Sequence, residues 1–381
     1  MDLEERMLQH IGPEGVLGAV WCLDRGGDAR IRWAGSLDPE GTRPVGRDTL
    51  FRISSMTKPI TAVTALTLVA DGTLVLDDAV DRWLPELAGR RVMRDPDGSL
   101  ADTVPADRAI TPRDLLAFTL GIGMDFPRYG QQPVLQAAEE LELGAGPPQP
   151  QGPPPPDEWM RRLGTLPLEA QPGERWLYHV GADVLGVLVA RAAGRSLEEA
   201  MIDRVLGPLG MDGTRFSVPA SSRHRFGAVF SVDPASGRRT TYDEVDGQWS
   251  SAPRFPSGGA GLVSTIDDYL ALARLLRAAG RHDGSQLLPA ELVAEMTRNQ
   301  LTEGQLAASA IDASGDQGFG FCVGVLLRDA DGRHAGTYGW SGGMGSDWYT
   351  DPTDDQIGII LTNQMFTGPE LPPICRDLLT A

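Results

Sequence analysis

The feature that most constrains the fold is the position of strand-like segments at both ends of the chain, with helix-like segments between them. Near the start, residues 16–23 and 29–34 are typical of a hairpin joined by the turn at residues 24–28. Near the end, strands are expected at residues 318–327, 337–340, 348–350 and 356–363. Strands from both ends usually pair in one sheet, so the sequence predicts an α+β fold in which helices flank an antiparallel sheet.

The middle of the chain carries helix signals and one proline-rich stretch. Thr111 followed by Pro112 is typical of a helix start, and further helices are expected over residues 181–193 and 265–279. Residues 144–156 are packed with proline and predict an extended, exposed loop. Such a loop is either a plain connector or one flank of an active-site mouth.

A chain of 381 residues is long for one simple core and suggests about two lobes. We expect a mostly helical domain over residues 101–244, inserted into a sheet domain formed by residues 1–100 and 245–381. The net charge of −18 argues against a nucleic-acid partner, which needs a basic surface, and an acidic surface also repels anionic lipid. No stretch approaches the roughly 20 apolar residues of a membrane-spanning helix.

The few cysteines and histidines also limit the chemistry. An acidic N-terminal segment does not resemble a signal peptide, so we expect a cytoplasmic protein with free thiols. The cysteines are sparse and lack C-x-x-C spacing: Cys22, Cys322 and Cys375. No metal site is expected, because the histidines are scattered without a ligand-like neighbour: His10, His179, His224, His282 and His334.

Ser55 and Lys58 form an S-x-x-K motif at the start of the almost wholly apolar run 60–70. Residues three apart on a helix lie on one face, so the amine can reach the hydroxyl. Burial against the apolar run disfavours the ammonium form and leaves an amine that can accept the serine proton. The same residues also fit an ordinary helix start, in which a serine caps the helix, Pro59 occupies the first turn and Lys58 is solvated.

This motif belongs to a series of blocks in which the sequence resembles the serine β-lactamase and penicillin-binding-protein superfamily. The resemblance is to the class C-like branch, and within it most of all to the family VIII carboxylesterases. It implies a β-lactamase-like fold and covers nearly the whole chain. The blocks follow the family's order at residues 51–58, 71–78, 110–119, 172–178, 183–186, 257–265 and 339–343.

The family's second motif, Y-x-N, reads Tyr178-His179-Val180 in this chain. By resemblance, Tyr178 is a general base or proton shuttle that works with Lys58, whose ammonium favours the phenolate. Tyrosines are more often hydrogen-bonded core residues, and the surrounding block favours the catalytic role. The asparagine is replaced by Val180. We expect Asp183 either to hold Lys58 in its place or to interact with the helix dipole.

The family's third motif, K-T-G in lactamases, aligns with Trp340-Ser341-Gly342, a W-x-G form similar to that of family VIII esterases. The resemblance makes these residues and Asp183 candidates for substrate binding, with Trp340 as an apolar wall suited to an uncharged ester. By analogy, the backbone N–H groups of Ser55 and Gly343 form the oxyanion hole. Residues 339–343 also fit G-x-S-x-G, but no histidine follows Ser341, which argues against an α/β-hydrolase elbow.

We therefore expect a serine carboxylesterase that needs no cofactor and acts on a small-molecule ester through a Ser55 acyl-enzyme, with Lys58 and Tyr178 accepting the proton. The alternatives of the same fold are a β-lactamase, a DD-peptidase-like hydrolase or an acyltransferase, and weak β-lactamase activity is compatible with the esterase. A non-catalytic binding homologue is a further alternative. Its support is the asparagine lost at Val180.

Overall fold

The computed structural model describes residues 2–144, 146–309, 311, 314–368 and 370–380, so Ala145 of the predicted proline-rich loop lies outside the described residues. A seven-stranded sheet contains strands from both ends of the chain, in the order β11-β12-β13-β14-β15-β1-β2. All neighbouring strands in it are antiparallel, as predicted. Its strands are β1 (Gly18–Arg25), β2 (Asp28–Gly35), β11 (Gln317–Phe319), β12 (Gly324–Leu326), β13 (Tyr338–Gly342), β14 (Ser346–Asp351) and β15 (Gln356–Thr362).

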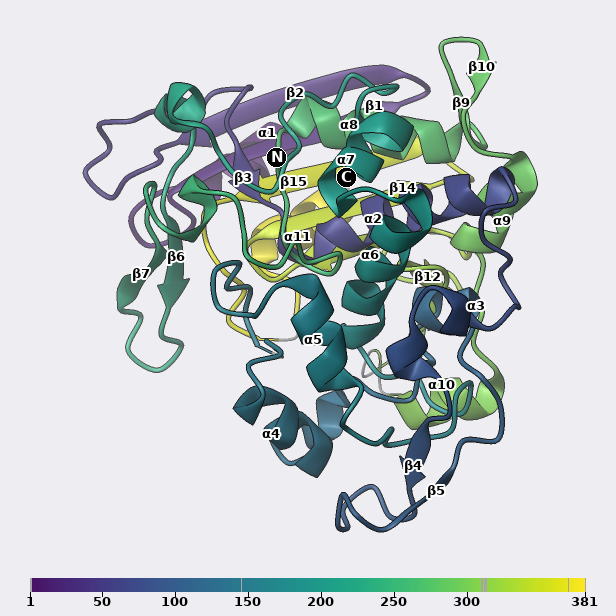
Figure 1. Ribbon diagram of the computed structural model, residues 1–381. Helices are drawn as coiled ribbons and strands as arrows, with labels where there is room; N and C mark the ends of the chain where they lie inside the picture. The colour runs from purple at the N-terminus through teal and green to yellow at the C-terminus, as the bar shows by residue number, and fades with distance from the viewer. Residues whose placement is uncertain (1, 145, 310, 312–313, 369, 381) are drawn as a thin grey trace.

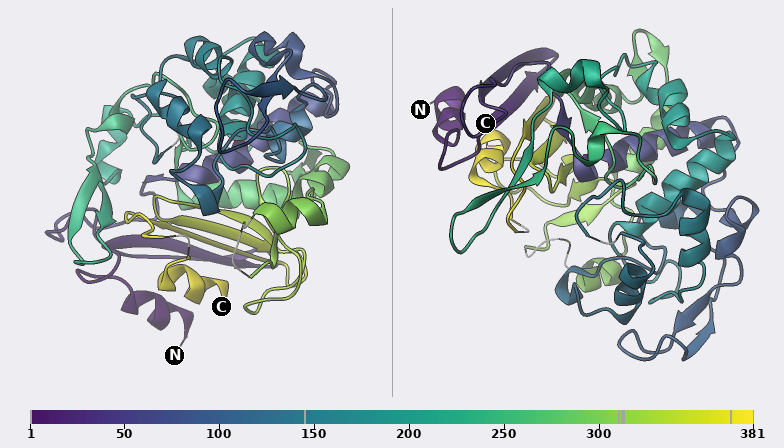
Figure 2. Two further views of the ribbon diagram at one scale, coloured as in Figure 1. Left: turned by 90° about the horizontal axis from the view of Figure 1, so that it is seen from below. Right: turned by 60° about the vertical axis from the view of Figure 1, so that its left-hand side comes forward.

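The two faces of the sheet are covered by different helices (Figures 1 and 2). Side chains alternate along β1: Ala19 and Trp21 join a cluster with α11 (Pro373–Leu379), while Val20 and Cys22 join the main core. α1 (Leu3–Gln9) packs beside α11, and α8 (Ile266–Arg277) lies against β1 and β15. The terminal helices therefore close one face, and the other face carries the main core.

Further elements lie outside the seven-stranded sheet. Among the further helices are α4 (Pro133–Glu140), α5 (Pro156–Leu163), α7 (Leu197–Met201), α9 (Ala290–Thr297) and α10 (Glu303–Ser309). The described residues also form four two-stranded ribbons outside the large sheet: β3 (Phe51–Arg52) with β8 (Val263–Ser264), β4 (Arg91–Met93) with β5 (Thr103–Pro105), β6 (Val229–Val232) with β7 (Arg239–Asp243), and β9 (Arg281–His282) with β10 (Ser285–Gln286).

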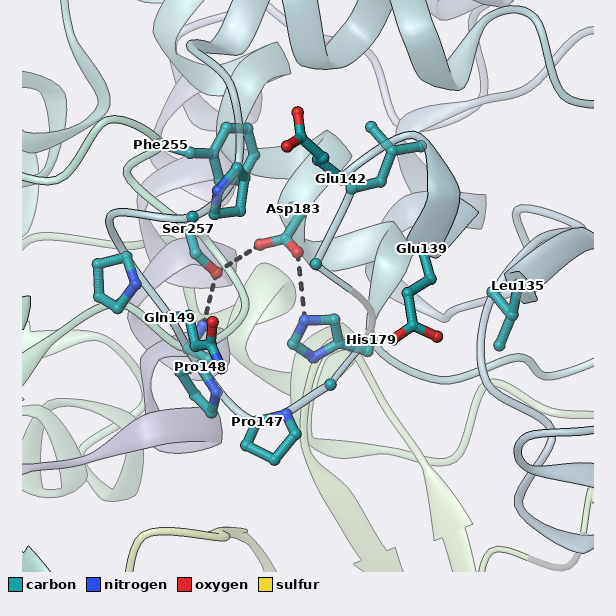
Figure 3. Close-up of a pocket in the computed structure, with 18 of the residues that line it drawn as sticks. Leu135, Glu139, Glu142, Pro147, Pro148, Gln149, His179, Asp183, Phe255 and Ser257 are labelled. Carbon is teal, nitrogen blue, oxygen red and sulfur yellow. Dashed lines mark hydrogen bonds and ion pairs between the residues drawn. The ribbon is translucent and has the colours of Figure 1, made fainter. Parts of the chain in front are cut away.

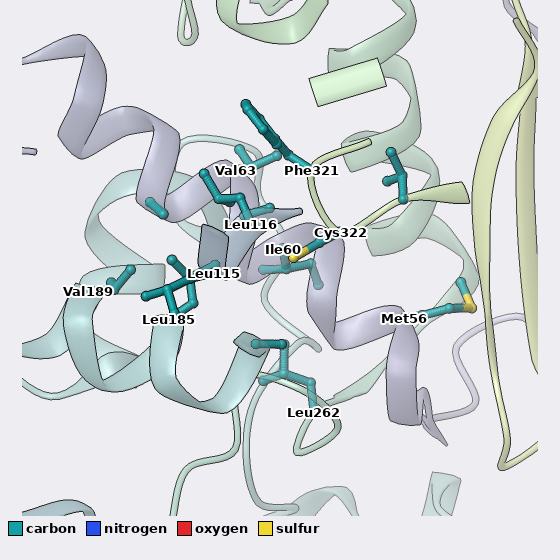
Figure 4. Packing of buried hydrophobic residues seen from close by; sticks show 14 of the residues in the cluster. Met56, Ile60, Val63, Leu115, Leu116, Leu185, Val189, Leu262, Phe321 and Cys322 are labelled. Carbon is teal, nitrogen blue, oxygen red and sulfur yellow. The ribbon is translucent and has the colours of Figure 1, made fainter. Parts of the chain in front are cut away.

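α2 (Thr57–Ala70) runs through the middle of the main core. Its residues from Thr57 to Leu68 are buried on every side, which is the pattern of a helix enclosed by other elements. Ile60 and Val63 belong to one buried cluster with Leu185 of α6 (Val180–Ala193) and Leu115 of α3 (Pro112–Leu116) (Figure 4). The first turn of α2 therefore holds the Lys58 side chain away from solvent, and the solvated alternative is wrong.

Two sequence predictions need correction. The expected single strand over residues 318–327 is two strands, β11 and β12, separated by a tight turn. In that turn Cys322 has a φ of 60°, and the N–H groups of Phe321 and Cys322 donate to Met296 and Leu116 carbonyls. An uninterrupted apolar run fits a buried turn as well as a strand, so periodicity could not separate them. Ser55 also lies in a 3₁₀ turn (Ser54–Met56) before α2, instead of inside an α-helix.

Other predicted boundaries hold to within a few residues. Thr111 caps α3 by accepting the Asp114 N–H, and Thr265 caps α8 by accepting the Asp268 N–H. The cysteines are free, as expected, and all three are buried. Among the described residues, no helix combines the length and apolar character needed to cross a membrane.

Candidate active site

Ser55 and Lys58 lie at the boundary between the core and the solvent. The Lys58 Nζ atom is 2.9 Å from Ser55 Oγ, and the lysine is 0% exposed. Ser55 is partly exposed, whereas its neighbour Ser54 is buried. A substrate can therefore reach the hydroxyl from outside while the amine acts on it from inside.

The other contacts of Lys58 are all with uncharged groups. Nζ donates to the Gly259 carbonyl oxygen at 2.7 Å and lies 3.2 Å from His179 Nδ1. It also lies 4.6 Å from the ring centroid of Tyr178. Within the described part of the chain, no carboxylate comes within ion-pair distance of Nζ. The polar groups that the described residues place around the amine are therefore a hydroxyl, a carbonyl and an imidazole, and none is a carboxylate.

His179 separates Lys58 from Asp183, and sequence reasoning missed this histidine as a site residue. His179 Nε2 lies 3.2 Å from Asp183 Oδ2, so Asp183 reaches Lys58 through the imidazole instead of holding it directly. Burial, then the Lys58 charge, lowers the pKa of His179, which is neutral at neutral pH. Burial alone would raise the pKa of Asp183, but His179 and the Ser257 hydroxyl hold it below its usual value.

Asp183 is bound on its other side by the 257–261 loop. Its Oδ1 accepts the Ser257 hydroxyl at 2.6 Å and the Gly259 N–H at 3.0 Å. Close packing of this loop on α6 requires glycine, because a Cβ on Gly258 would lie 2.5 Å from the Ala182 carbonyl oxygen. The same loop thus anchors the Asp183 carboxylate and supplies the Gly259 carbonyl to Lys58.

The backbone at His179 is strained. His179 has φ 82° and ψ −63°, and the Val180 N–H donates to the Tyr178 carbonyl at 3.2 Å. These angles and this bond define the rare γ-turn with positive φ. Tyr178 just before it is fixed by backbone bonds to Met124 in both directions, each 2.8 Å. The turn brings the Tyr178 and His179 rings to Lys58 from adjacent positions.

Trp340 does more than add an apolar wall. Its indole Nε1 donates to the Tyr178 hydroxyl oxygen at 3.0 Å. Phe126, which is 42% exposed, packs on the same tyrosine with ring centroids 5.2 Å apart. Tyr178 therefore stands in an aromatic cluster whose outer edge is open to solvent, and its oxygen receives a donor that stabilises negative charge.

The rest of the W-x-G motif divides between the two sides of β13. The Ser341 hydroxyl donates to Asp347 Oδ1 at 2.6 Å. Gly342 packs directly on the nucleophile turn, since a Cβ there would lie 2.2 Å from the Ile53 carbonyl oxygen. Gly343 follows in the exposed turn before β14. The oxyanion hole of Ser55 and Gly343 stays a prediction.

A cavity of about 580 Å³ adjoins the site behind His179 and Asp183 (Figure 3). The predicted proline-rich loop lines it with Pro147, Pro148 and Pro150, beside His179 and Asp183, and a flank of the active-site mouth at Ser55 stays a prediction. Ser55 and Tyr178 are not among its lining residues. Three carboxylates line it, from Glu139, Glu142 and Asp183, and among the described lining residues none is lysine or arginine.

One histidine outside the site acquires neighbours that the sequence did not indicate. His334 Nδ1 lies 3.1 Å from Asp351 and 3.6 Å from Asp354, and the ligand atoms of the three residues lie within 4.8 Å of one another. The pair with Asp351 raises the pKa of His334. We interpret this cluster as surface ion pairing, which exposed acidic groups commonly form.

Comparisons with known proteins show the family and the fold of the chain. The Beta-lactamase family model matches residues 4–374, so the chain belongs to that family. Protein Rv1367c of Mycobacterium tuberculosis is 37% identical over 91% of this chain and 85% of its own length. Esterase EstB of Burkholderia gladioli is 33% identical over 93% and 87%. The solved structure of EstCE1, a hydrolase with promiscuous acyltransferase activity, is 26% identical, with a TM-score of 0.81 over 100% of this chain and 98% of its own.

Proposed function

We propose that the protein is a serine carboxylesterase that cleaves small-molecule esters through an acyl-enzyme on Ser55, similar to family VIII carboxylesterases. The observation that carries this proposal is the buried Lys58 amine, 2.9 Å from a partly exposed serine hydroxyl. The 33% identity with an esterase over most of both chains supports it.

In the proposed mechanism, Ser55 Oγ attacks the ester carbonyl carbon while its proton passes to Lys58 Nζ or Tyr178. The carbonyl oxygen becomes negative and is bound by the N–H groups of Ser55 and Gly343. The tetrahedral intermediate collapses, and the alkoxide leaves with a proton from Tyr178 or Lys58. Water then attacks the acyl-enzyme with the same groups in reverse, releasing the acid and restoring the Ser55 hydroxyl.

The charges around the site favour an ester without a negative charge. Trp340 stands where lactamases have the lysine that binds the substrate carboxylate. The cavity behind His179 also carries carboxylates and no cationic side chain among its described lining. Phe126 and Trp340 flank Tyr178 with aromatic surface that binds apolar groups by removing them from water. Neutral, apolar esters should therefore be better substrates than β-lactams, whose carboxylate lacks a partner.

A second candidate function is acyl transfer by the same acyl-enzyme. It differs from hydrolysis only in the nucleophile that attacks the acyl group, an alcohol or amine in place of water. The similarity to EstCE1, a hydrolase with promiscuous acyltransferase activity, favours this alternative. Adding an alcohol acceptor and measuring the ratio of transferred to hydrolysed product separates the two activities.

The test is the initial rate on a short-chain p-nitrophenyl ester for wild type, Ser55→Ala and Ser54→Gly. We expect Ser55→Ala to lose at least about a thousandfold in kcat/KM, as removal of a nucleophile does. Ser54 is the matched control: its φ of 45° suits glycine, so Ser54→Gly should stay within about threefold of wild type. No wild-type turnover, or turnover that survives Ser55→Ala, contradicts the proposal.

A further inference from the structure

His179 occupies the variable middle position of the family's Y-x-N motif. In this protein its backbone and its ring are nevertheless closely constrained. The ring is enclosed at 6% exposure, and its backbone adopts a φ of 82°, which is strained for a residue other than glycine. Both ring nitrogens have partners: Nδ1 faces Lys58 at 3.2 Å, and Nε2 faces Asp183 at 3.2 Å. The strained backbone and the two buried polar contacts indicate that the orientation of the His179 ring is constrained.

The Asp183 carboxylate determines which nitrogen carries the proton. A carboxylate only accepts hydrogen bonds, so the neutral imidazole must present Nε2–H to it. Nδ1 is then unprotonated, and its lone pair points at Lys58 Nζ. Asp183 is itself immobilised by Ser257 and the Gly259 N–H, so the tautomer is fixed by a chain of hydrogen bonds that ends in the 257–261 loop.

This tautomer leaves one direction for the lone pair of a neutral Lys58. A neutral amine has two hydrogens and one lone pair. The Gly259 carbonyl and His179 Nδ1 are acceptors and take the two hydrogens. The remaining neighbour is Ser55 Oγ at 2.9 Å, which must then donate its own hydrogen to the amine. With a donor at Nδ1 instead, the lone pair would turn toward His179 and away from the nucleophile.

We propose that His179 is a positioning residue: held by Asp183, its unprotonated Nδ1 accepts a hydrogen bond from Lys58 and so aims the amine lone pair at the Ser55 hydroxyl. When Oγ bonds to the ester carbonyl carbon, its proton moves to Nζ, and the resulting ammonium has three hydrogens for three acceptors: His179 Nδ1, the Gly259 carbonyl and the departing oxygen. This inference rests on the proposed function for the neutral form of Lys58 and for the kinetic consequence, whereas the tautomer of His179 does not depend on it.

The kinetic test compares two substitutions at His179. In His179→Asn the amide oxygen can stand where Nδ1 stands and accept from Lys58, whereas His179→Leu has a side chain of similar bulk and no acceptor. We expect kcat of His179→Leu to fall about a hundredfold with KM within about threefold, and His179→Asn to recover at least about tenfold of that loss. His224→Asn, at an exposed position, is the control. Equal losses in the Asn and Leu variants, or a change mainly in KM, overturn the positioning role.

The structural test needs no substrate. Long-range proton–nitrogen NMR of labelled wild type should show one histidine, absent from the His179→Asn spectrum, as the Nε2–H tautomer across neutral pH. In Asp183→Asn that tautomer should no longer be exclusive. A wild-type Nδ1–H tautomer, or a charged ring at neutral pH, overturns the inference. Because this readout is independent of turnover, absence of esterase activity would sink the proposed function without altering the tautomer result.

Discussion

Two buried basic side chains six residues apart, Arg52 and Lys58, have opposite surroundings. Arg52 meets the Asp243 carboxylate at 2.5 Å and two backbone carbonyls, and its guanidinium lies over the Phe226 ring at 4.0 Å. Lys58 is equally enclosed, but it contacts a hydroxyl, a carbonyl and an imidazole. Its nearest acid, Asp183, is one ring away.

The difference shows that the fold surrounds Arg52, which stabilises the structure, differently from Lys58, which is proposed to act in catalysis. Burial lowers the pKa of Arg52 to about 10, which still leaves it charged at neutral pH, and Asp243 compensates that charge permanently. A direct carboxylate at Lys58 would do the same and hold its proton. At Lys58 the acceptors among the described residues are neutral, and they orient the amine. The proposed role of Lys58 as a base is linked to its separation from a carboxylate.

The largest effect is expected when Lys58 is replaced by arginine. Lys58→Arg places a permanent positive charge at the site that cannot give up its proton, and the planar guanidinium does not fit the three separate acceptors that the Lys58 amine contacts. We expect kcat/KM for ester hydrolysis to fall about a thousandfold, within the range for loss of a general base. Activity within tenfold of wild type would mean that Lys58 acts by charge alone, and the contrast with Arg52 would then disappear.

A buried acid with no ion pair among the described residues, Asp347, sharpens the comparison from the other side. Asp347 contacts the Ser341 hydroxyl, and burial raises its pKa to about 6 against that bond. The folded-state pKa lies above the unfolded value, so the acid costs no stability below about pH 4, and folding loses stability as pH rises through about 6. Asp347→Asn removes this cost.

We therefore expect Asp347→Asn to raise the free energy of unfolding at pH 8 by up to about 3 kcal/mol, since each pH unit between the two pKa values is worth about 1.4 kcal/mol. At pH 4 the gain should vanish. Urea unfolding of wild type and variant at both pH values provides the measurement. A gain of the same size at pH 4 and pH 8 would show that the substitution acts through packing instead of ionisation.

The smallest expected effect is the loss of stability when Arg52 is replaced by lysine. Arg52→Lys keeps the charge but loses the fork that contacts Asp243 and the carbonyls of Gly227 and Glu244 together. We expect the free energy of unfolding to fall by about 2 kcal/mol, while activity per folded molecule stays within about threefold of wild type. A large loss of activity in fully folded Arg52→Lys would place this pair in the site and remove the distinction.

The sequence predicted the architecture and the outline of the site, for physical reasons. Strand signals at both ends led to the antiparallel sheet, and the apolar run after Lys58 predicted its burial. The turn at residues 320–323 was missed because a buried turn and a buried strand are equally apolar. Residue spacing predicts well which side chains share one helix or strand. It predicts contacts between different elements poorly.

His179 was missed for that second reason. The resemblance directed attention to Tyr178 and to the replaced asparagine at Val180, and a histidine between them carried no periodic signal. Its role depends on Gly259 and Ser257, which are far away in sequence and reach it only through the packing of one loop on α6. The Trp340–Tyr178 hydrogen bond was likewise invisible, because an indole in a motif predicts apolar surface before it predicts a donor.

The decisive measurement is direct detection of the acyl-enzyme. Wild type, Ser55→Ala and Lys58→Arg are mixed with a p-nitrophenyl ester, quenched in acid within the first turnover, digested and sequenced by mass spectrometry. We expect one acyl group on Ser55 in wild type, none in Ser55→Ala, and greatly slowed labelling in Lys58→Arg. An acyl group on another residue, or Ser55 labelled as fast in Lys58→Arg as in wild type, would contradict the proposed role of Lys58 among its neutral neighbours.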